Sequence, residues 1–590
     1  MVILHSSHEK ELYQEVNQGI AALLRDNPRT TMQDALWKVA SDMRANNPFC
    51  PPKKGCPVNN LPTELLAHIF YLGTDTQEEE VEEEDCEDDE LNLLGEEDEV
   101  DDGEEGKDGE EGEEEGPKAS DRDIPDEYDE DDYDDDAELP FQVLVSHVCK
   151  HWRDVAVESP ALWTTITFTE GAPFEKSRIW IERSKGRPLD INIDCTIPAD
   201  GDPDANPDED KSDEEASEEE ESKEPPPFFS KDDLSTILDI ITPHVERWRT
   251  LEVMVNIYEY VHNIMQRLVQ CSSAPLLEIL QLYHYEDCEE YDTFEPAHFK
   301  TPFLLFNGNA PNLTHVALWG VHLPWEESTF LSGLTDLELA YHAKDVRPSF
   351  EAFANILRSS PEIHTLTLCL SGPAGDFADW GGEMIELPSL KDLVLCYHEP
   401  SYIESLMRLI SVPNVHSLAL DYDEGDYSSF LRQLTRPLKG MKKSLLAGLE
   451  HLKISGLPCD HKSMDLMFEQ LANLKSINLN CTGDETFFDK LMKPVPSSFL
   501  VATGKVSLYC PNLHTITTTG IEGAKMKQFV ETRRAAGIPL TKVLMSEEDD
   551  VDIKEEKWLR DHLETLEFFE PSDSEEEVDI DEDDPDMDID

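Results

Sequence analysis

The stretch Leu390-Lys391-Asp392-Leu393-Val394-Leu395 places an apolar side chain at its first, fourth and sixth positions. The same spacing occurs in nine segments of the chain, and only the last departs from it, with Thr518 at the sixth position. Alternation of apolar and polar residues at the end of each segment is typical of a strand that is buried on one side. We therefore expect nine short strands. The segments begin at Leu277, Leu313, Leu334, Ile363, Leu390, Val415, Leu449, Leu474 and Leu513.

Proline stands two residues before six of the nine segments, as Pro311 and Pro388 illustrate. A proline ends a preceding helix and favours extended backbone, so it separates a helix from the strand that follows. Stretches with helical patterns lie between the segments, for example at 349–359, 402–410 and 463–471. The segments begin 21 to 39 residues apart, which is the length of one strand plus one helix.

This alternation of strand and helix resembles the leucine-rich repeat, in which short parallel strands line a concave face and helices cover the outside. The family prefers Asn or Cys at the ninth position, whereas this chain has other residues there, among them His342, Ser371 and His398. The resemblance implies an α/β fold with an irregular solenoid whose concave face carries strand positions 2, 3 and 5. An unrelated α/β domain with unevenly spaced strands is the alternative.

Acidic residues are concentrated in three tracts of a chain whose formal net charge is −81. Residues 73–138 hold 38 acidic side chains, 199–224 hold 14 and 570–590 hold 13. Such tracts bury too little apolar surface to offset the entropy of ordering, so we expect all three to be disordered. The predicted organisation is an N-terminal helical segment (1–58), a helical domain (59–166) with an acidic insertion (73–138), a bridge (167–198), an acidic loop (199–227), the repeat domain (228–569) and an acidic tail (570–590).

Two amphipathic fragments flank the first tract. Residues 60–70 read Asn-Leu-Pro-Thr-Glu-Leu-Leu-Ala-His-Ile-Phe, with apolar residues at helical spacing. Pro62 suits a first helical turn, and Glu64 lies where a helix N-terminus favours negative charge. A second apolar face follows after the tract, through Leu144, Val148 and Trp152. Two helices of about three turns each bury little surface alone, which favours a role in binding a partner.

The order Leu-Pro-x-Glu-Leu-Leu-x-x-Ile-Phe, Val-Cys-Lys-x-Trp-Arg and Pro-x-Leu-Trp, with 73–138 looped out, resembles the F-box. The resemblance implies docking onto the Skp-type adaptor of a Skp/cullin/F-box ubiquitin ligase, with apolar anchors from a helix placed in a groove. Carried over by position, the first-helix contacts are Leu61, Pro62, Leu65, Ile69 and Phe70. Second-helix contacts or core positions are Val148, Cys149 and Trp152.

Motifs of several enzyme classes are missing from the sequence. We find no phosphate-binding G-x-x-x-x-G-K-[ST], no G-x-G-x-x-G after a strand, no H-E-x-x-H and no G-x-S-x-G. The twelve scattered cysteines match no zinc spacing, so we predict neither catalysis nor a cofactor or metal. The strong negative charge disfavours nucleic-acid binding. With no apolar run long enough for a membrane span and no secretory signal, we expect a soluble cytoplasmic or nuclear protein.

Two functional hypotheses follow. The first is a non-catalytic substrate-recognition subunit, in which the F-box-like domain binds the adaptor and the repeats bind a protein substrate that the sequence does not identify. The second is an acidic scaffold or histone-chaperone-like protein, whose tracts capture basic partners through their charge. Salt-sensitive binding that disappears when the tracts are deleted would distinguish the second hypothesis from the first.

Overall fold

The computed structural model of the chain describes residues 25, 38–39, 58, 61–84, 139–196, 229–285, 292–375, 378, 380–381, 383–422, 424–439, 441–495 and 508–569. They belong to two compact units, one within 1–162 and one within 163–590. Nearly all of the predicted N-terminal helical segment lies outside the described residues. The same holds for 85–138, 199–227 and 570–590, so the disorder predicted there stays a prediction.

Between residues 61 and 162, the described part of the first unit is helical. Its helices are α3 (Thr63–Glu84), α4 (Phe141–Val148) and α5 (Lys150–Glu158), and the 3-10 helix η2 (Pro160–Trp163) follows. Pro62 precedes the first turn of α3, where its carbonyl accepts hydrogen bonds from the N–H groups of Leu65 and Leu66. The sequence therefore correctly places the start of this helix.

Two details of the first unit differ from the sequence-based prediction. The single second helix is in fact two, because Cys149 is extended (φ −161°, ψ 168°) between α4 and α5. Arg153 bridges the break, since its Nε donates a hydrogen bond to the carbonyl of Ser146 at 3.0 Å. The helix α3 continues to Glu84, so residues 73–84 of the insertion are helical and not disordered. Glutamate is a good helix former, which explains how α3 extends without an apolar stripe.

The core of the first unit forms where α3 meets α4 and α5. Leu66 and Phe70, one turn apart on α3, are buried. The Phe70 ring lies 5.1 Å from the ring of Trp152 on α5, at an interplanar angle of 54°. Gly73 approaches α4 so closely that a Cβ atom there would lie 2.3 Å from the Phe141 ring. Aromatic packing and this close approach hold the three helices together.

The second unit is built on a parallel sheet of 14 strands. Every strand is hydrogen-bonded to the next strand of this sheet along the chain, and β8 (Ile385–Glu386) and β10 (Ile410–Ser411) form a separate small pair. The strands of the large sheet are β1 (Thr165–Thr167), β2 (Leu189–Asp194), β3 (Trp248–Val255), β4 (Ile279–His284), β5 (His315–Trp319), β6 (Asp336–Ala340), β7 (Thr365–Cys369), β9 (Asp392–Cys396), β11 (Ser417–Asp421), β12 (His451–Ser455), β13 (Ser476–Asn480), β14 (Thr515–Thr519), β15 (Lys542–Ser546) and β16 (Thr565–Phe569).

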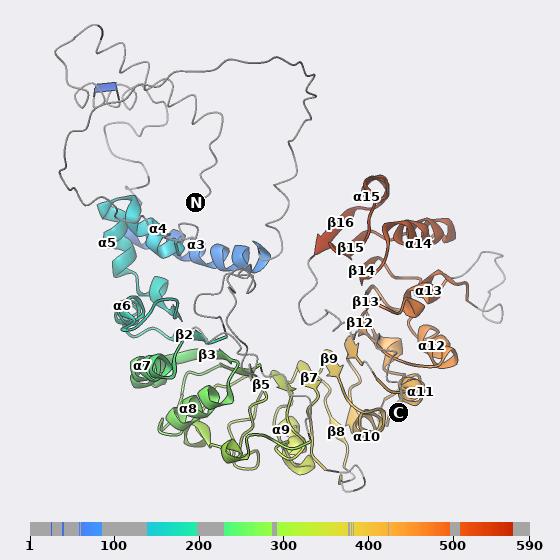
Figure 1. Cartoon of the computed structure of the whole chain (residues 1–590), viewed down its shortest axis with the longest axis horizontal. Helices are drawn as coiled ribbons and strands as arrows, with labels where there is room; N and C mark the ends of the chain where they lie inside the picture. The colour runs from blue at the N-terminus through green and yellow to red at the C-terminus, as the bar shows by residue number, and fades with distance from the viewer. Residues whose placement is uncertain are drawn as a thin grey trace, which may run out of the picture. The chain divides into compact units, whose positions relative to one another are not determined.

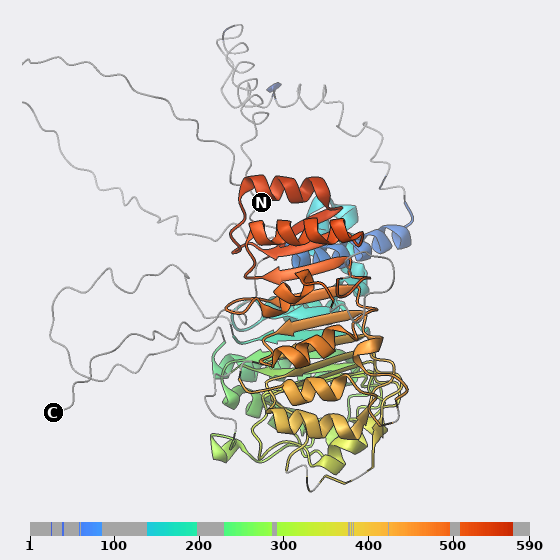
Figure 2. The same ribbon diagram turned by 90° about the vertical axis from the view of Figure 1, so that its right-hand side faces the viewer.

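Helices connect these strands and lie on one side of the sheet (Figures 1 and 2). They are α6 (Glu175–Arg183), α7 (Lys231–Ile241), α8 (Tyr258–Leu268), α9 (Phe350–Arg358), α10 (Pro400–Leu409), α11 (Ser428–Leu434), α12 (His461–Phe468), α13 (Thr486–Met492), α14 (Gly523–Ala536) and α15 (Ile553–His562). The 3-10 helices of this unit are η3 (Thr242–Arg247), η4 (Ala297–Phe299), η5 (Leu305–Gly308) and η6 (Leu446–Gly448). The α/β class predicted from the sequence is confirmed.

All nine predicted strands are present, and each contains positions 3 to 7 of its segment. Five further strands belong to the same sheet: β1, β2, β3, β15 and β16. The bridge 167–198 thus contributes a repeat, and the predicted helical domain at 59–166 ends inside β1. The five additional strands carry the same kind of spacing, in Trp163-Ile166-Phe168, Pro188-Ile191-Ile193, Trp248-Leu251-Val253, Leu540-Val543-Met545 and Leu563-Leu566-Phe568.

Register aligns the fourth positions of all strands in one row. Leu393 of β9, for example, pairs with Leu366 of β7 and with Leu418 of β11. Positions 1, 4 and 6 form the core beneath the helices, and Leu390, Leu393 and Leu395 are all buried. Burying one leucine side chain contributes about 1.5–3 kcal/mol, so the rows are the main source of stability. Positions 3, 5 and 7 point to the opposite side, which we call the open face.

Asparagine side chains link successive repeats before the strands begin. Asn312 precedes position 1 of its repeat, and its Nδ2 donates a hydrogen bond to the carbonyl of Pro275 in the preceding repeat at 2.9 Å. Asn414, Asn473 and Asn512 make the equivalent bond to Pro388, Ala447 and Ala472, at 2.7, 2.9 and 2.9 Å. These bonds satisfy carbonyl groups that the turns leave without a strand partner.

A buried histidine links neighbouring repeats beyond the end of β6. Six strands are followed at position 8 by a residue with left-handed backbone. Tyr341, which follows β6, is one of these residues (φ 53°). At position 9, His342 is fully buried; its Nε2 donates to the Val321 carbonyl at 2.9 Å, and its Nδ1 lies 2.8 Å from Ser371 Oγ. Both partners occupy position 9 of neighbouring repeats. The buried imidazole thus links neighbouring repeats.

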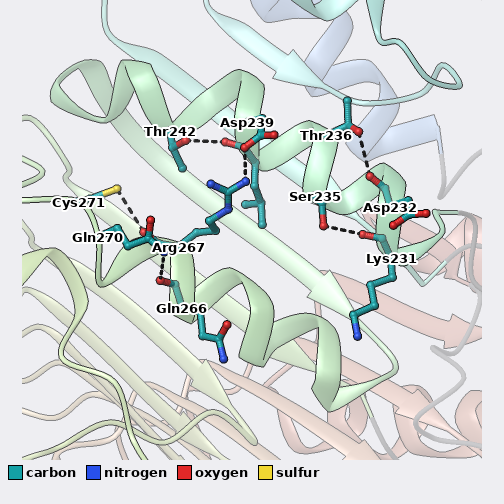
Figure 3. A network of polar contacts seen from close by, with 11 residues as sticks. Lys231, Asp232, Ser235, Thr236, Asp239, Thr242, Gln266, Arg267, Gln270 and Cys271 are labelled. Carbon is teal, nitrogen blue, oxygen red and sulfur yellow. Dashed lines mark hydrogen bonds and ion pairs between the residues drawn. The ribbon is translucent and has the colours of Figure 1, made fainter.

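Ion pairs and hydroxyl groups complete the outer surface between α7 and α8 (Figure 3). Arg267 of α8 pairs with Asp239 of α7. The hydroxyl groups of Ser235 and Thr236 donate to the carbonyls of Lys231 and Asp232, both at 2.9 Å. These polar groups lie on the exposed side of the helices, where such pairs contribute up to about 1 kcal/mol each.

The core position that departs from the apolar pattern can be tested by substitution. Thr518 is fully buried at position 6, and its Oγ1 has no hydrogen-bond partner among the described residues. An unpaired buried hydroxyl costs about 1–3 kcal/mol, and valine has nearly the same shape. We expect Thr518→Val to raise the free energy of unfolding by about 1 kcal/mol or more, measured by thermal denaturation. Thr517→Val on the open face is the control, and an equal gain there would contradict this explanation.

Buried histidines predict that the second unit loses stability in acid. Burial lowers the pKa of His342 and of His398 to about 3, from an ordinary value of 6.5. Folded chains keep these rings neutral while unfolded chains take up protons, so stability falls as pH drops below about 6.5. Each ring contributes up to about 1.4 kcal/mol per pH unit in this range.

The variant His342→Asn keeps a donor and an acceptor at position 9 but removes one titrating group. We expect its melting temperature to fall less steeply than that of the wild type as the pH is lowered. His461→Asn, at an exposed position, is the matched control. Identical pH slopes for the two variants would contradict the role assigned to His342.

Candidate functional site

The first candidate surface consists of apolar side chains that the first unit leaves exposed. Leu65 and Ile69 on α3 are 52% and 49% exposed, and Val148 on α4 is 60% exposed. Leu72 and Leu144 are also exposed. We call these five residues the α3–α4 apolar surface. Exposed apolar side chains on two packed helices are typical of a surface that binds another protein.

The residues predicted as adaptor contacts fall into two groups. Pro62, Leu65, Ile69 and Val148 are exposed, and Leu61 is half-buried, so these side chains are accessible in whole or in part. Phe70 is only 1% exposed and packs on Trp152, so its side chain is not accessible to a partner in this conformation.

Cys149 and Trp152 are half-buried and serve the internal structure of the first unit. Cys149 forms the extended break between α4 and α5. Trp152 provides the ring against which Phe70 packs. Of the two roles that the resemblance allows for these residues, the core role has direct support.

Leu72 and Leu144 were not among the predicted contacts. Leu72 lies seven residues after Leu65, which is two helical turns along the same stripe. Leu144 lies one turn before Val148 on α4. Helical spacing alone would therefore have identified both residues, starting from contacts that the resemblance had already assigned.

The second candidate surface is an aromatic cluster on the open face of the sheet. Trp319 of β5 lies 5.3 Å from Tyr283 and 5.6 Å from Tyr285, both with edge-to-face geometry. Tyr341 lies 5.4 Å from Trp319 on its other side. Tyr285 is exposed and the other three rings are half-buried. We call these four residues the aromatic cluster.

Two carboxylates lie on the position 5 row beside this cluster. Glu338 accepts a hydrogen bond from Trp319 Nε1 at 2.9 Å, and Glu252 accepts one from Asn192 Nδ2 at 2.9 Å. Partial burial raises the pKa of both carboxyl groups. Negative charge from Glu338 and Glu252 adds to the effect of burial in raising the pKa of Tyr283. The tyrosine therefore lies in the field of both carboxylates.

The aromatic cluster was not predicted from the sequence, because only strand positions 2, 3 and 5 were assigned to the concave face. Tyr283 and Trp319 occupy position 7, which continues the same alternation by two residues. In a strand, residues two apart share a face, so position 7 follows directly from positions 3 and 5.

A pocket of about 500 Å³ lies beyond the ends of β6, β7 and β9. Its main cation, Arg347, donates hydrogen bonds to the carbonyls of His342 and Leu370, at 2.9 and 2.6 Å. Lys344 pairs with Asp292 and Glu399, at 2.8 and 3.3 Å. These internal partners favour a structural role for both cations.

Comparisons add no family assignment. No model of a known family matches the chain, and neither does any curated protein. In the part of the chain that the structure describes, no group of three or more His, Cys, Asp or Glu residues is arranged to hold a metal ion. Among the same residues, no helix is both long and apolar enough to cross a membrane.

The division between buried and exposed apolar residues on α3 can be tested directly. Phe70→Ala removes a buried ring and should destabilise the first unit by about 3–5 kcal/mol. Leu65→Ala changes an exposed side chain and should alter stability by no more than about 0.5 kcal/mol. Hydrogen exchange of peptides from α3, α4 and α5 in the full chain measures both effects. Equal loss of protection in the two variants would show that α3 packs through a different face.

Proposed function

We propose that this chain is a non-catalytic substrate-recognition subunit of a Skp/cullin/F-box ubiquitin ligase. In this proposal the first unit docks onto the Skp-type adaptor, and the open face of the second unit binds a protein substrate. The observation that carries the proposal is the exposure of Leu65, Ile69 and Val148, which are residues that the F-box resemblance assigns to the adaptor.

The physical case rests on the cost of leaving these side chains in water. Each apolar side chain of this size gains about 1.5–3 kcal/mol when it is fully removed from solvent. Leu65 and Ile69 lie one turn apart on α3, so both can enter one groove of a partner. The packing of Phe70 on Trp152 supports this arrangement from behind, because it fixes how α3 lies against α5.

The insertion places a geometric condition on docking. Residues 73–84 extend α3 by about three turns beyond the F-box-like motif. An adaptor that contacts Leu65 and Ile69 must therefore leave room for this extension, which carries acidic residues from Asp75 onward. Repulsion from an acidic partner is screened beyond about 8 Å at physiological salt, so it affects only close approaches.

Substitution of the exposed side chains tests adaptor docking. The double variant Leu65→Asp/Val148→Asp places charge at two anchors without touching the Phe70–Trp152 contact. If both are anchors, its affinity for a purified Skp-type adaptor should fall more than about 100-fold. The matched control is Ile257→Asp/Ile553→Asp, which makes the same change at exposed apolar positions of the second unit. Calorimetric titration measures both.

Undiminished adaptor binding by the double variant would refute the proposed docking surface, and absence of binding by the wild-type chain would refute the proposed function.

The acidic scaffold hypothesis predicts a different result. It rests on the composition of the tracts, and it requires salt-sensitive histone binding that is lost when 85–138, 199–224 and 570–590 are deleted. Adaptor binding should survive that deletion, because α3 remains whole.

A further inference from the structure

The open face is strongly acidic over the half of the sheet that contains the aromatic cluster. From β2 to β11, positions 3, 5 and 7 carry no Lys or Arg. The only basic group at these strand positions is His315, which lies 3.8 Å from Asp336. The carboxylates at these positions are Asp190, Asp194, Glu252, Asp336, Glu338, Asp392 and Asp421. Asp190 is paired with Arg249 of β3, which stands at position 2. Beyond β11, the lysines at positions 3, 5 and 7 are Lys453 of β12 and Lys542 of β15.

Between β2 and β11, the aromatic residues at positions 3, 5 and 7 are Tyr283 and Trp319. Tyr283 and Trp319 occupy position 7 on β4 and β5, whereas the next three strands of the row carry Ala340, Cys369 and Cys396. Register brings the two rings together, because Tyr283 pairs directly with Trp319. The faces of aromatic rings carry partial negative charge, which attracts a cation placed over them. The rings and the carboxylates thus both favour a positively charged ligand.

We propose that the open face between β3 and β6 binds a basic segment of the substrate protein, with a lysine or arginine side chain on the aromatic cluster between Glu252 and Glu338. This inference rests on the proposed role of the chain as a substrate receptor and names the chemistry of the substrate. Large, rigid rings beside a charged group are typical of the residues that dominate binding energy at protein interfaces.

Burial of the two carboxylates supports this assignment. Glu252 and Glu338 are partly removed from water, and this burial raises the pKa of each. A cation placed between them would restore favourable electrostatics to both groups. Each also accepts a hydrogen bond from a neighbouring side chain, so the carboxylates are held in place before a ligand arrives.

Selection from a random peptide library displayed on phage, against the full chain at physiological salt, tests the proposal. The selected peptides should share a lysine or arginine. Replacing that residue by acetyl-lysine or citrulline, which keeps its shape and removes its charge, should weaken binding about tenfold or more. Selected peptides without a cation, or equal binding of the neutral versions, would overturn the proposal.

The acidic tracts could also attract a basic peptide, so the variants must separate the site from general charge. Glu252→Gln/Glu338→Gln removes two charges at the site, and the amide oxygen introduced on β6 would still accept a hydrogen bond from Trp319. Glu362→Gln/Glu531→Gln removes two charges at exposed positions away from the open-face rows. We expect about a tenfold loss of peptide affinity for the first variant and no change for the second. An equal loss for both variants would overturn the proposal.

Adaptor binding by the same variants distinguishes this inference from the proposed function. Glu252→Gln/Glu338→Gln should bind the Skp-type adaptor as the wild type does, because neither residue belongs to the first unit. If adaptor binding is intact and the peptides show no preference for a cation, the present inference alone fails. If cation-dependent peptide binding is found and the adaptor does not bind, only the proposed function fails.

Discussion

In-register parallel pairing of the strands is the constraint on which the second unit depends. Position 4 of every strand in the large sheet is aligned with position 4 of its neighbours, from Ile166 in β1 to Leu566 in β16. A slip of one residue would turn the apolar row toward the open face and the polar row toward the helices. The asparagine bonds before the strands and the His342 bonds after them hold both ends of this register. The aromatic cluster exists because that register places Tyr283 beside Trp319.

Much of this fold could be predicted from the apolar residues at positions 1, 4 and 6 of each repeat. The burial of side chains at that spacing is a local property of a strand. The strands β1, β3, β15 and β16 were not predicted, although Leu540, Val543 and Met545 at β15 carry the same pattern. The break at Cys149 could not be predicted, because the apolar residues on either side keep the spacing of one helix. Histidine at position 9 was read only as a departure from the family, yet it has the donor and the acceptor that the link between repeats needs.

Helical periodicity alone does not determine which apolar residues of α3 are buried and which remain exposed. Leu65 and Leu66 are adjacent, as are Ile69 and Phe70. Helical spacing therefore allows the core to contain either Leu65 with Ile69 or Leu66 with Phe70. Leu66 and Phe70 are buried because Trp152 on α5 supplies a ring for Phe70. That choice depends on a residue far away in the sequence, beyond the insertion, and it leaves Leu65 and Ile69 exposed. Contacts across the insertion therefore determine which stripe of α3 is available to a partner.

The position of β16 at the end of the sheet has a consequence for self-association. An edge strand presents backbone donors and acceptors that can pair with a second copy, and natural sheets protect such edges with charge. In this chain the 13 acidic residues of 570–590 begin directly after Phe569, the last residue of β16. Two molecules that met edge to edge would bring two such segments together. Like-charge repulsion between the two segments would oppose such an encounter.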